Sequence, residues 1–163
     1  MSSSDRRAFL LSVLALGACG FTPAYGPSGG AGVLQSQVRL TDPVGRDGYL
    51  LNRRLEERLG RGGPSARYAM KVTPIVTQSG MGSTSRGLTT RFQLLGKAKF
   101  LMTDPVTADV LAEGEVQSFT GYSATGTTVA TLAAERDARQ RLMTILADMV
   151  VDRLLVAASG LPS

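Results

Sequence analysis

The chain has 163 residues, of which 43% are hydrophobic and 19% are charged, so its length and composition fit one globular domain with a buried core and exclude a disordered chain. It contains no histidine and one cysteine, which excludes serine–histidine and cysteine–histidine dyads, an internal disulfide and most zinc and haem sites. The formal net charge of +5 favours polyanionic partners such as nucleic acid, anionic lipid or a phosphorylated glycolipid.

Residues 1–18 have the layout of a secretory signal. Arg6 and Arg7 precede an apolar run at residues 8–16, which is too short to cross a bilayer. The run ends in Leu-Gly-Ala-Cys, which resembles the bacterial lipobox, so we expect Cys19 to be the lipidated first residue of the mature protein. The alternative is an ordinary signal peptide or a signal anchor with a chance cysteine. The arginine pair leaves twin-arginine and general secretory export equally open.

A tether, a short strand and a helix are predicted before the first long strand. Residues 19–32 are rich in Gly, Pro and Ser, which predicts a lipidated cysteine followed by a flexible tether. Residues 33–40 alternate loosely between apolar and polar side chains and are predicted to form a first strand. Asp47 is expected to cap a helix over residues 48–59.

The predicted helix has one apolar stripe, because leucine recurs every four residues along it. Its arginines are partly balanced by acidic residues at helical spacing, so we interpret them as a solvated surface. These residues are Leu51, Leu55 and Leu59 on the stripe, and Arg53, Arg54, Arg58 and Arg61 beside Glu56 and Glu57.

Three further strands are predicted over residues 67–78, 88–102 and 110–122. Pro74 indicates a sheet edge or a bulge within the first of them, and residues 79–87 form a hairpin loop. Pairing Lys99 with Glu113 and Lys97 with Glu115 opposes unlike charges and keeps the apolar faces aligned, so we predict this register.

A long helix is predicted over residues 129–157. Its core stripe follows a three–four spacing and comprises Ala138, Leu142, Ile145, Leu146, Met149, Val150 and Leu154. The sequence therefore predicts an α+β fold of order β-α-β-β-β-α, with two helices packed on one face of a four-stranded mixed, mostly antiparallel sheet. The other face is expected to be polar and free. Residues 33–158 form this single domain, and residues 159–163 are a C-terminal tail.

Several short motifs occur in the order found in one known family. They are Cys-Gly-Phe-x-Pro-x-Tyr-Gly at residues 19–26, the Leu51, Leu55 and Leu59 repeat, Thr90-Arg91-Phe92, Gly121-Tyr122, and Glu135-x-Asp137-Ala138. Together they resemble the lipopolysaccharide-assembly lipoprotein family LptE, in its alphaproteobacterial form, over essentially the whole chain.

This resemblance implies a role without catalysis. Members of the family are lipid-anchored at the periplasmic face of the outer membrane, where they assemble with and plug the LptD β-barrel. The pair delivers lipopolysaccharide to the outer leaflet, and the family is held to bind lipopolysaccharide itself. Gly20, in place of aspartate after the lipidated cysteine, agrees with the outer membrane.

Five cationic residues are candidates for binding the phosphates and carboxylates of lipopolysaccharide. Arg86 in the hairpin loop and Arg91 beyond it have no acidic residue opposite them in the predicted register. Lys97 and Lys99 are also candidates, although the alternative, cross-strand pairing with glutamates, is favoured for them. The last helix opens without a basic residue, which departs from the family pattern, so a contact there would need Arg136 or Arg139. Ordinary solvated surface arginines are the alternative for Arg86 and Arg91.

Other functions fit the sequence less well. A periplasm-facing lipoprotein that binds another envelope component shares the signal and the fold, and it stays open as the alternative. An enzyme is not expected, since the carboxylates form no convincing pair and no cofactor or metal cluster is predicted. A nucleic-acid binder would explain the charge, but it conflicts with the export signal and lacks interleaved aromatic and basic residues.

Overall fold

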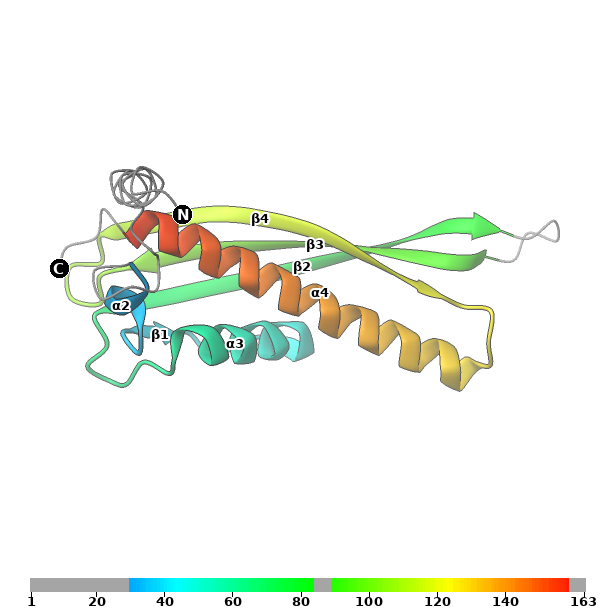
Figure 1. The fold of residues 1–163 in the computed structure, drawn as a ribbon, viewed down its shortest axis with the longest axis horizontal. Helices are drawn as coiled ribbons and strands as arrows, with labels where there is room; N and C mark the ends of the chain where they lie inside the picture. Colours follow the sequence, from blue (N-terminus) through cyan, green and yellow to red (C-terminus); the bar gives the residue numbers. More distant parts are fainter. Residues whose placement is uncertain (1–29, 84–88, 159–163) are drawn as a thin grey trace, which may run out of the picture.

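Strands and helices occur in the predicted order, preceded by one short helix. The computed structural model describes residues 30–83 and 89–158. Its elements are α2 (Gly30–Leu34), β1 (Val38–Leu40), α3 (Gly45–Leu59), β2 (Tyr68–Ser83), β3 (Thr89–Thr103), β4 (Val110–Ser123) and α4 (Thr128–Ala157). Figure 1 shows the strands as one long twisted layer with α3 and α4 along one side. The predicted α+β fold with two helices on one sheet face is confirmed.

The sheet has the order β1-β2-β3-β4, with β1 parallel to β2 and the other pairs antiparallel. Because β1 pairs only with Tyr68–Met70, the rest of β2 is an edge. Pro74 lies in this stretch and pairs with Ala98 on its other side. A proline cannot donate to a second neighbouring strand, so its place at an edge confirms the expectation.

The start of the domain differs from the predicted first strand. Residues 30–34 are helical, inside the range predicted as tether and strand, and only Val38–Leu40 are extended. Leu34 is buried in the core. Ser36 adopts a φ of 58°, a left-handed backbone that no strand accommodates, and its N–H donates to the carbonyl of Leu59. The strand prediction was therefore wrong for residues 33–37.

The β3–β4 register is two residues away from the predicted one. Lys99 lies opposite Glu115, whereas Glu113 lies opposite Leu101. Half of the shift is already present at the turn, where Thr103 lies opposite Val110 and not opposite residue 109, and the other half is the extra residue that β4 has between the partners of Met102 and Thr103. A shift of two residues preserves the side of the sheet on which every side chain lies, so the predicted faces stay correct.

α3 and α4 pack against each other and run in the same direction, so the arginines of α3 are not all solvated. Arg54 donates from Nε and Nη2 to both carboxylate oxygens of Asp148 at 3.0 and 3.2 Å, and Arg58 donates to Oδ1 at 2.8 Å. These hydrogen bonds are the main reason that the pKa of Arg54 is raised. The solvated interpretation was wrong for this pair; Arg61 does bind Glu56 on the surface.

Asp47 has a different role from the predicted cap. The N-cap of α3 is Val44, and no side chain caps the helix. Asp47 instead lies in the first turn, where it accepts from Arg139 of α4 at 3.1 Å. Arg139 also donates to Glu135 at 3.1 Å, so this network joins the start of α3 to α4.

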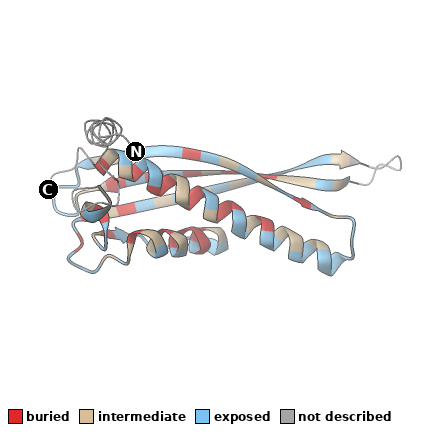
Figure 2. Ribbon diagram, viewed as in Figure 1, coloured by how far each residue is buried: buried red, intermediate tan, exposed pale blue. Residues whose placement is uncertain are grey.

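The core lies between the sheet and the two helices (Figure 2). α4 touches both the sheet and α3, so its buried face is wider than the single stripe that was predicted. Ile145 lies outside this face and is exposed, contrary to the prediction, and Met149 is half-buried. The buried residues of α4 are Ala138, Leu142, Met143, Leu146, Ala147, Val150, Val151 and Leu154.

α4 approaches the sheet most closely over Gly96 of β3. A Cβ atom at this position would lie 2.9 Å from a methyl carbon of Leu142 and from one of Leu146. Both leucines are fully buried and close-packed, so they have little room to move. The absence of a side chain at Gly96 therefore sets the distance between helix and sheet.

Candidate functional site

The side of the sheet that faces away from the helices is the candidate functional site. Alternate residues of each strand point to it, because side chains in a strand alternate between faces. We call this surface the open face. It comprises Lys71, Thr73, Ile75, Thr77 and Ser79 of β2; Arg91, Gln93, Leu95, Lys97, Lys99 and Leu101 of β3; and Glu113, Glu115, Gln117, Phe119 and Gly121 of β4.

An apolar patch lies in the middle of the open face. Leu95 is directly opposite Phe119 on one side and Thr77 on the other, and Ile75 lies in the next row. The exposed fractions of Ile75, Leu95 and Phe119 are 52%, 41% and 64%. The described helices all lie on the other side of the sheet, and the expectation that this face is polar throughout was wrong. Single exposed apolar residues are common on proteins, whereas a contiguous group indicates a contact surface.

Two lysines next to this patch share one glutamate. The Nζ atom of Lys97 is 3.4 Å from Glu115 Oε1, and that of Lys99 is 3.8 Å from Glu115 Oε2. The side chains of Lys97 and Lys99 are 45% and 68% exposed, and a single carboxylate cannot neutralise two cations. The predicted pairing of Lys97 with Glu115 is thus present as a diagonal contact, whereas Lys99 does not lie opposite Glu113. The group formed by Lys97, Lys99 and Glu115 therefore keeps a net positive charge.

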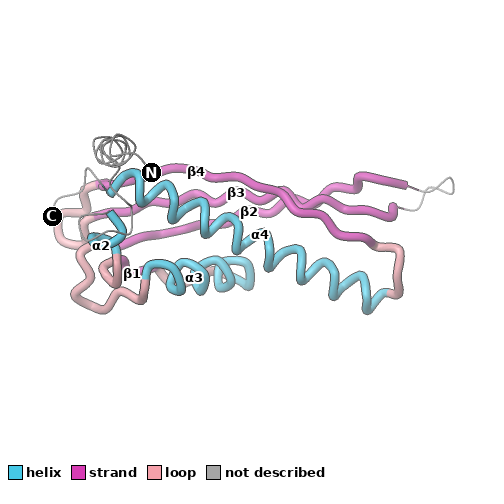
Figure 3. The backbone as a smooth tube through the Cα atoms, in the orientation of Figure 1, coloured by secondary structure: helices cyan, strands magenta, loops and turns pink. Residues whose placement is uncertain are grey.

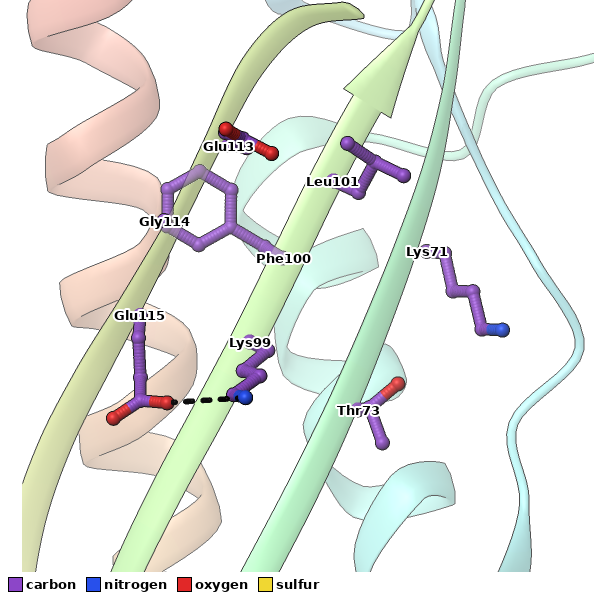
Figure 4. A pocket seen from close by; sticks show the side chains of 8 residues that line it. All are labelled: Lys71, Thr73, Lys99, Phe100, Leu101, Glu113, Gly114 and Glu115. Carbon is purple, nitrogen blue, oxygen red and sulfur yellow. Dashed lines mark ion pairs between the residues drawn. The ribbon is translucent and has the colours of Figure 1, made fainter.

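A shallow depression of about 490 Å³ lies beside these lysines (Figure 4). It is lined by Lys71, Thr73, Lys99, Phe100, Leu101, Glu113, Gly114 and Glu115. Figure 4 shows the Lys71 side chain extending from β2, apart from the Lys99–Glu115 contact. Within the described residues, Lys71 forms no ion pair. Lys71 was missed by the sequence analysis, although its alternation with the buried Tyr68 and Met70 could have placed it on this face.

The structure separates the five cationic candidates. Arg91 lies on the open face opposite Ser123, at the end of the sheet away from Lys71. Lys97 and Lys99 lie between them. Arg136 is on α4, on the other side of the sheet, so it does not join this group. Arg86 falls in residues 84–88, outside the described residues, as does Cys19.

The helix side of the same sheet end is closed by aromatic packing. Phe92 and Tyr122 are stacked, with ring centroids 5.3 Å apart. Burial, followed by the nearby charge of Glu135, raises the pKa of the Tyr122 hydroxyl above its usual value. The two rings therefore fill the helix side of the sheet at this position with apolar side chains.

Neither a metal site nor a membrane-spanning helix is found in the described part of the chain. No group of three or more metal-ligating side chains occurs within residues 30–83 and 89–158. None of the helices described there combines the length and apolar character needed to cross a membrane.

A family model and several solved structures match this chain. The family model described as LptE, lipopolysaccharide-assembly, matches residues 35–154. No curated protein matches the chain in sequence. Among solved structures, a protein of Caulobacter crescentus CB15 described as a lipoprotein has a TM-score of 0.67 at 24% identity, covering 82% of this chain and 100% of its own.

Two more distant structures share the fold. Rare lipoprotein B from Shewanella oneidensis has a TM-score of 0.57 at 12% identity and covers 76% of this chain and 96% of its own. A minor lipoprotein from Acinetobacter baumannii has a TM-score of 0.55 at 13% identity, covering 77% of this chain and 91% of its own. At these identities the structural matches establish the fold alone.

Proposed function

Since this chain belongs to the LptE family of lipopolysaccharide-assembly lipoproteins, we propose that it assembles with and plugs an LptD-type β-barrel and binds lipopolysaccharide during its transport to the outer leaflet. The family is a non-enzymatic component of lipopolysaccharide transport and belongs to the outer membrane. A lipid on Cys19, holding the domain at the periplasmic face of that membrane, is part of the proposal.

One observation carries the proposed ligand: cations and an apolar patch share the open face. Lipid A joins phosphates to acyl chains, so its recognition needs both kinds of surface. Lysine binds phosphate as a point charge, and arginine can bind it through two parallel hydrogen bonds. Ile75, Leu95 and Phe119 offer apolar area within one or two strand positions of Lys97.

The open-face cations differ in how available they are. Lys71 and Arg91 form no ion pair within the described residues. An anion that binds to Lys97 or Lys99 has to compete with the carboxylate of Glu115. We therefore expect Lys71 and Arg91 to contribute most. Arg86, which lies five positions before Arg91 in the sequence, is a further proposed contact. Arg136 could contact only a ligand that extends around the sheet.

The experiment that tests the assembly role is a mild-detergent pull-down of the tagged full-length protein from its own envelope. The eluate is read by mass spectrometry for proteins and glycolipid. A stoichiometric large β-barrel together with lipopolysaccharide is the expected result. Recovery of the lipoprotein without a barrel would contradict the proposal and favour a lipoprotein that binds another envelope component.

The same preparation tests the open face. In the double variant Lys71→Glu/Arg91→Glu we expect several-fold less lipopolysaccharide per mole of protein, with the barrel retained. Arg46→Glu is the matched control, because Arg46 is an exposed arginine near the start of α3, on the helix side of the sheet. Equal lipopolysaccharide recovery from the double variant and the wild type would show that the open face does not bind it.

A further inference from the structure

Four segments that are distant in sequence meet at one end of the domain (Figure 3). α2 leads into this end, since the N–H of Ser36 donates to Leu59 and that of Tyr68 donates to Gln37. The β3–β4 turn lies there too, because Thr103 pairs with both Ala69 and Val110. With the α3–β2 connection and the last turn of α4, these segments form what we call the anchor-side end.

The anchor-side end combines exposed apolar side chains with arginines. Val106 in the β3–β4 turn is 90% exposed, and Val156 of α4 is 77% exposed. A depression of about 510 Å³ lies next to Val106 and is lined by Arg39, Arg67, Pro64 and Pro105 among others. An apolar tip with arginines beside it has the composition of a surface that enters a membrane interface.

The arginines of this end are available for an external anion. Within the described residues, neither Arg39 nor Arg67 forms an ion pair. Asp104 is the acidic group beside Arg67, and its carboxylate already accepts hydrogen bonds from the backbone of the turn. Its Oδ1 accepts from the N–H groups of Val106 and Thr107 at 2.7 and 3.1 Å. These two bonds, and secondarily Arg67, lower the pKa of Asp104.

The length of the chain before α2 indicates which partner the anchor-side end contacts. Ten residues, 20–29, separate Cys19 from Gly30, the first residue of α2. A segment of this length reaches at most about 40 Å when fully extended. A lipid on Cys19 therefore holds the anchor-side end close to the bilayer at a high effective concentration.

We propose that, before the domain enters a barrel, the anchor-side end of the lipid-anchored protein rests on the phospholipid surface, with Arg39 and Arg67 against lipid phosphates and Val106 in the interface. The proposal rests on the proposed lipidation of Cys19. Contact at this end fixes the direction of the long axis relative to the membrane and directs the β2–β3 hairpin away from it.

A fluorescence experiment on the acylated full-length mature protein tests this. Acylation removes the thiol of Cys19, so a Val106→Cys variant carries one reactive thiol for an environment-sensitive dye. The protein is reconstituted into vesicles of phosphatidylcholine and phosphatidylglycerol with spin-labelled lipid as quencher. The matched control is Val129→Cys, because Val129 is 77% exposed near the start of α4, at the other end of the molecule.

We expect a blue shift and loss of most of the emission for the dye at position 106, and little change at position 129. Arg39→Glu/Arg67→Glu should reduce the quenching at position 106 while the circular dichroism spectrum stays the same. Equal quenching at both positions, or none at 106, would overturn the proposal, and unchanged quenching in the arginine variant would overturn the role of the two arginines.

Two readouts separate this result from the proposed function. These vesicles contain neither a β-barrel nor lipopolysaccharide, so quenching at position 106 is independent of the envelope pull-down. The mass of the purified protein reports acylation before reconstitution. A chain without an acyl group would overturn the membrane contact, because the tether argument would then fail, while barrel assembly would still be decided by the pull-down.

Discussion

The two faces of β3 are built from alternate residues of one strand, yet they have opposite roles. Toward the helices the residues at even positions from Leu94 to Met102 are all buried. Toward the solvent, Leu95, Lys97, Lys99 and Leu101 remain at least partly exposed. Stability is therefore concentrated on one face, while the other can carry cations and apolar side chains suited to a ligand. Substitutions on the open face can change binding without unfolding the domain.

Two charge clusters, one around Asp148 and one around Glu115, differ in the same way. Asp148 joins two arginines of α3 to α4 through three hydrogen bonds of 2.8 to 3.2 Å. Glu115 instead meets two lysines at 3.4 and 3.8 Å on the open face. The first cluster holds two helices together, whereas the second is a loose surface contact that an anion can replace.

Alanine at two adjacent leucines gives the largest contrast between the faces. Leu94 is fully buried and Leu95 is 41% exposed. We expect Leu94→Ala to lower the free energy of unfolding by about 2–5 kcal/mol, since it leaves a cavity beneath α4. Leu95→Ala should cost less than about 1 kcal/mol. Urea unfolding followed by circular dichroism measures both, and equal losses would mean that the open face is part of the core.

A side chain at Gly96 should disturb the contact between helix and sheet. Gly96→Val places methyl groups where Leu142 and Leu146 already lie, and we expect a loss of about 1–3 kcal/mol from overpacking. Thr77→Val, on the open face of β2, is the control of similar shape and should change stability by less than about 0.5 kcal/mol. A neutral result for Gly96→Val in thermal unfolding would show that α4 is not held closely at this point.

The free energy of unfolding should respond differently when the central carboxylate of each cluster, Asp148 or Glu115, is removed. Asp148→Ala leaves Arg54 and Arg58 without their hydrogen bonds to α4, with an expected loss of about 1–2 kcal/mol. Glu115→Ala should change the free energy of unfolding by no more than about 0.5 kcal/mol, because the contact is exposed. The same variant should increase lipopolysaccharide recovery, since it frees Lys97 and Lys99. A larger destabilisation by Glu115→Ala than by Asp148→Ala would reverse the comparison.

The smallest effect is expected at Asp104, which belongs to neither face. Its pKa is lower in the folded than in the unfolded chain, so the unfolded chain binds more protons in acid. The stabilisation is therefore complete above the unfolded pKa, near about pH 4, and is lost as the pH falls through the folded value. Asp104→Asn should lower the urea midpoint slightly at neutral pH, with the difference from wild type disappearing in strong acid. A difference that persists in acid would assign the effect to the turn rather than to its charge.

Local patterns in the sequence predicted the faces of the strands but not their alignment. The alternation of Gly96, Ala98 and Phe100 with Lys97 and Lys99 is enough to assign sides, because the period of a strand is two. The register depends on the residue of β4 at which pairing begins and on one extra residue in β4 beside the turn, and nothing in the composition of the turn reveals either. Even so, an error of two residues kept Lys97 within reach of Glu115.

Contacts between distant residues were the part that the sequence did not reveal. Arg54 and Asp148 are 94 positions apart, so helical spacing within α3 showed only the glutamates near it. The width of the buried face of α4 likewise depends on α3 lying beside it, which explains why Met143, Ala147 and Val151 were missed. Of the candidate site, Arg91, Lys97 and Lys99 were placed on the correct face, whereas Lys71 was overlooked.

α4 follows all four strands in the sequence, so the sheet is synthesised before the helix that covers it. Until residues 138–154 emerge, Phe100 and Met102 have no helix to pack against except α3, which reaches only part of the sheet. Folding must then wait for contacts between segments about 40 residues apart, which makes it slow and leaves apolar surface exposed on the way. Any chaperone or translocation factor that binds the emerging chain therefore meets the helix side of the strands uncovered, and it must release that surface before α4 can dock.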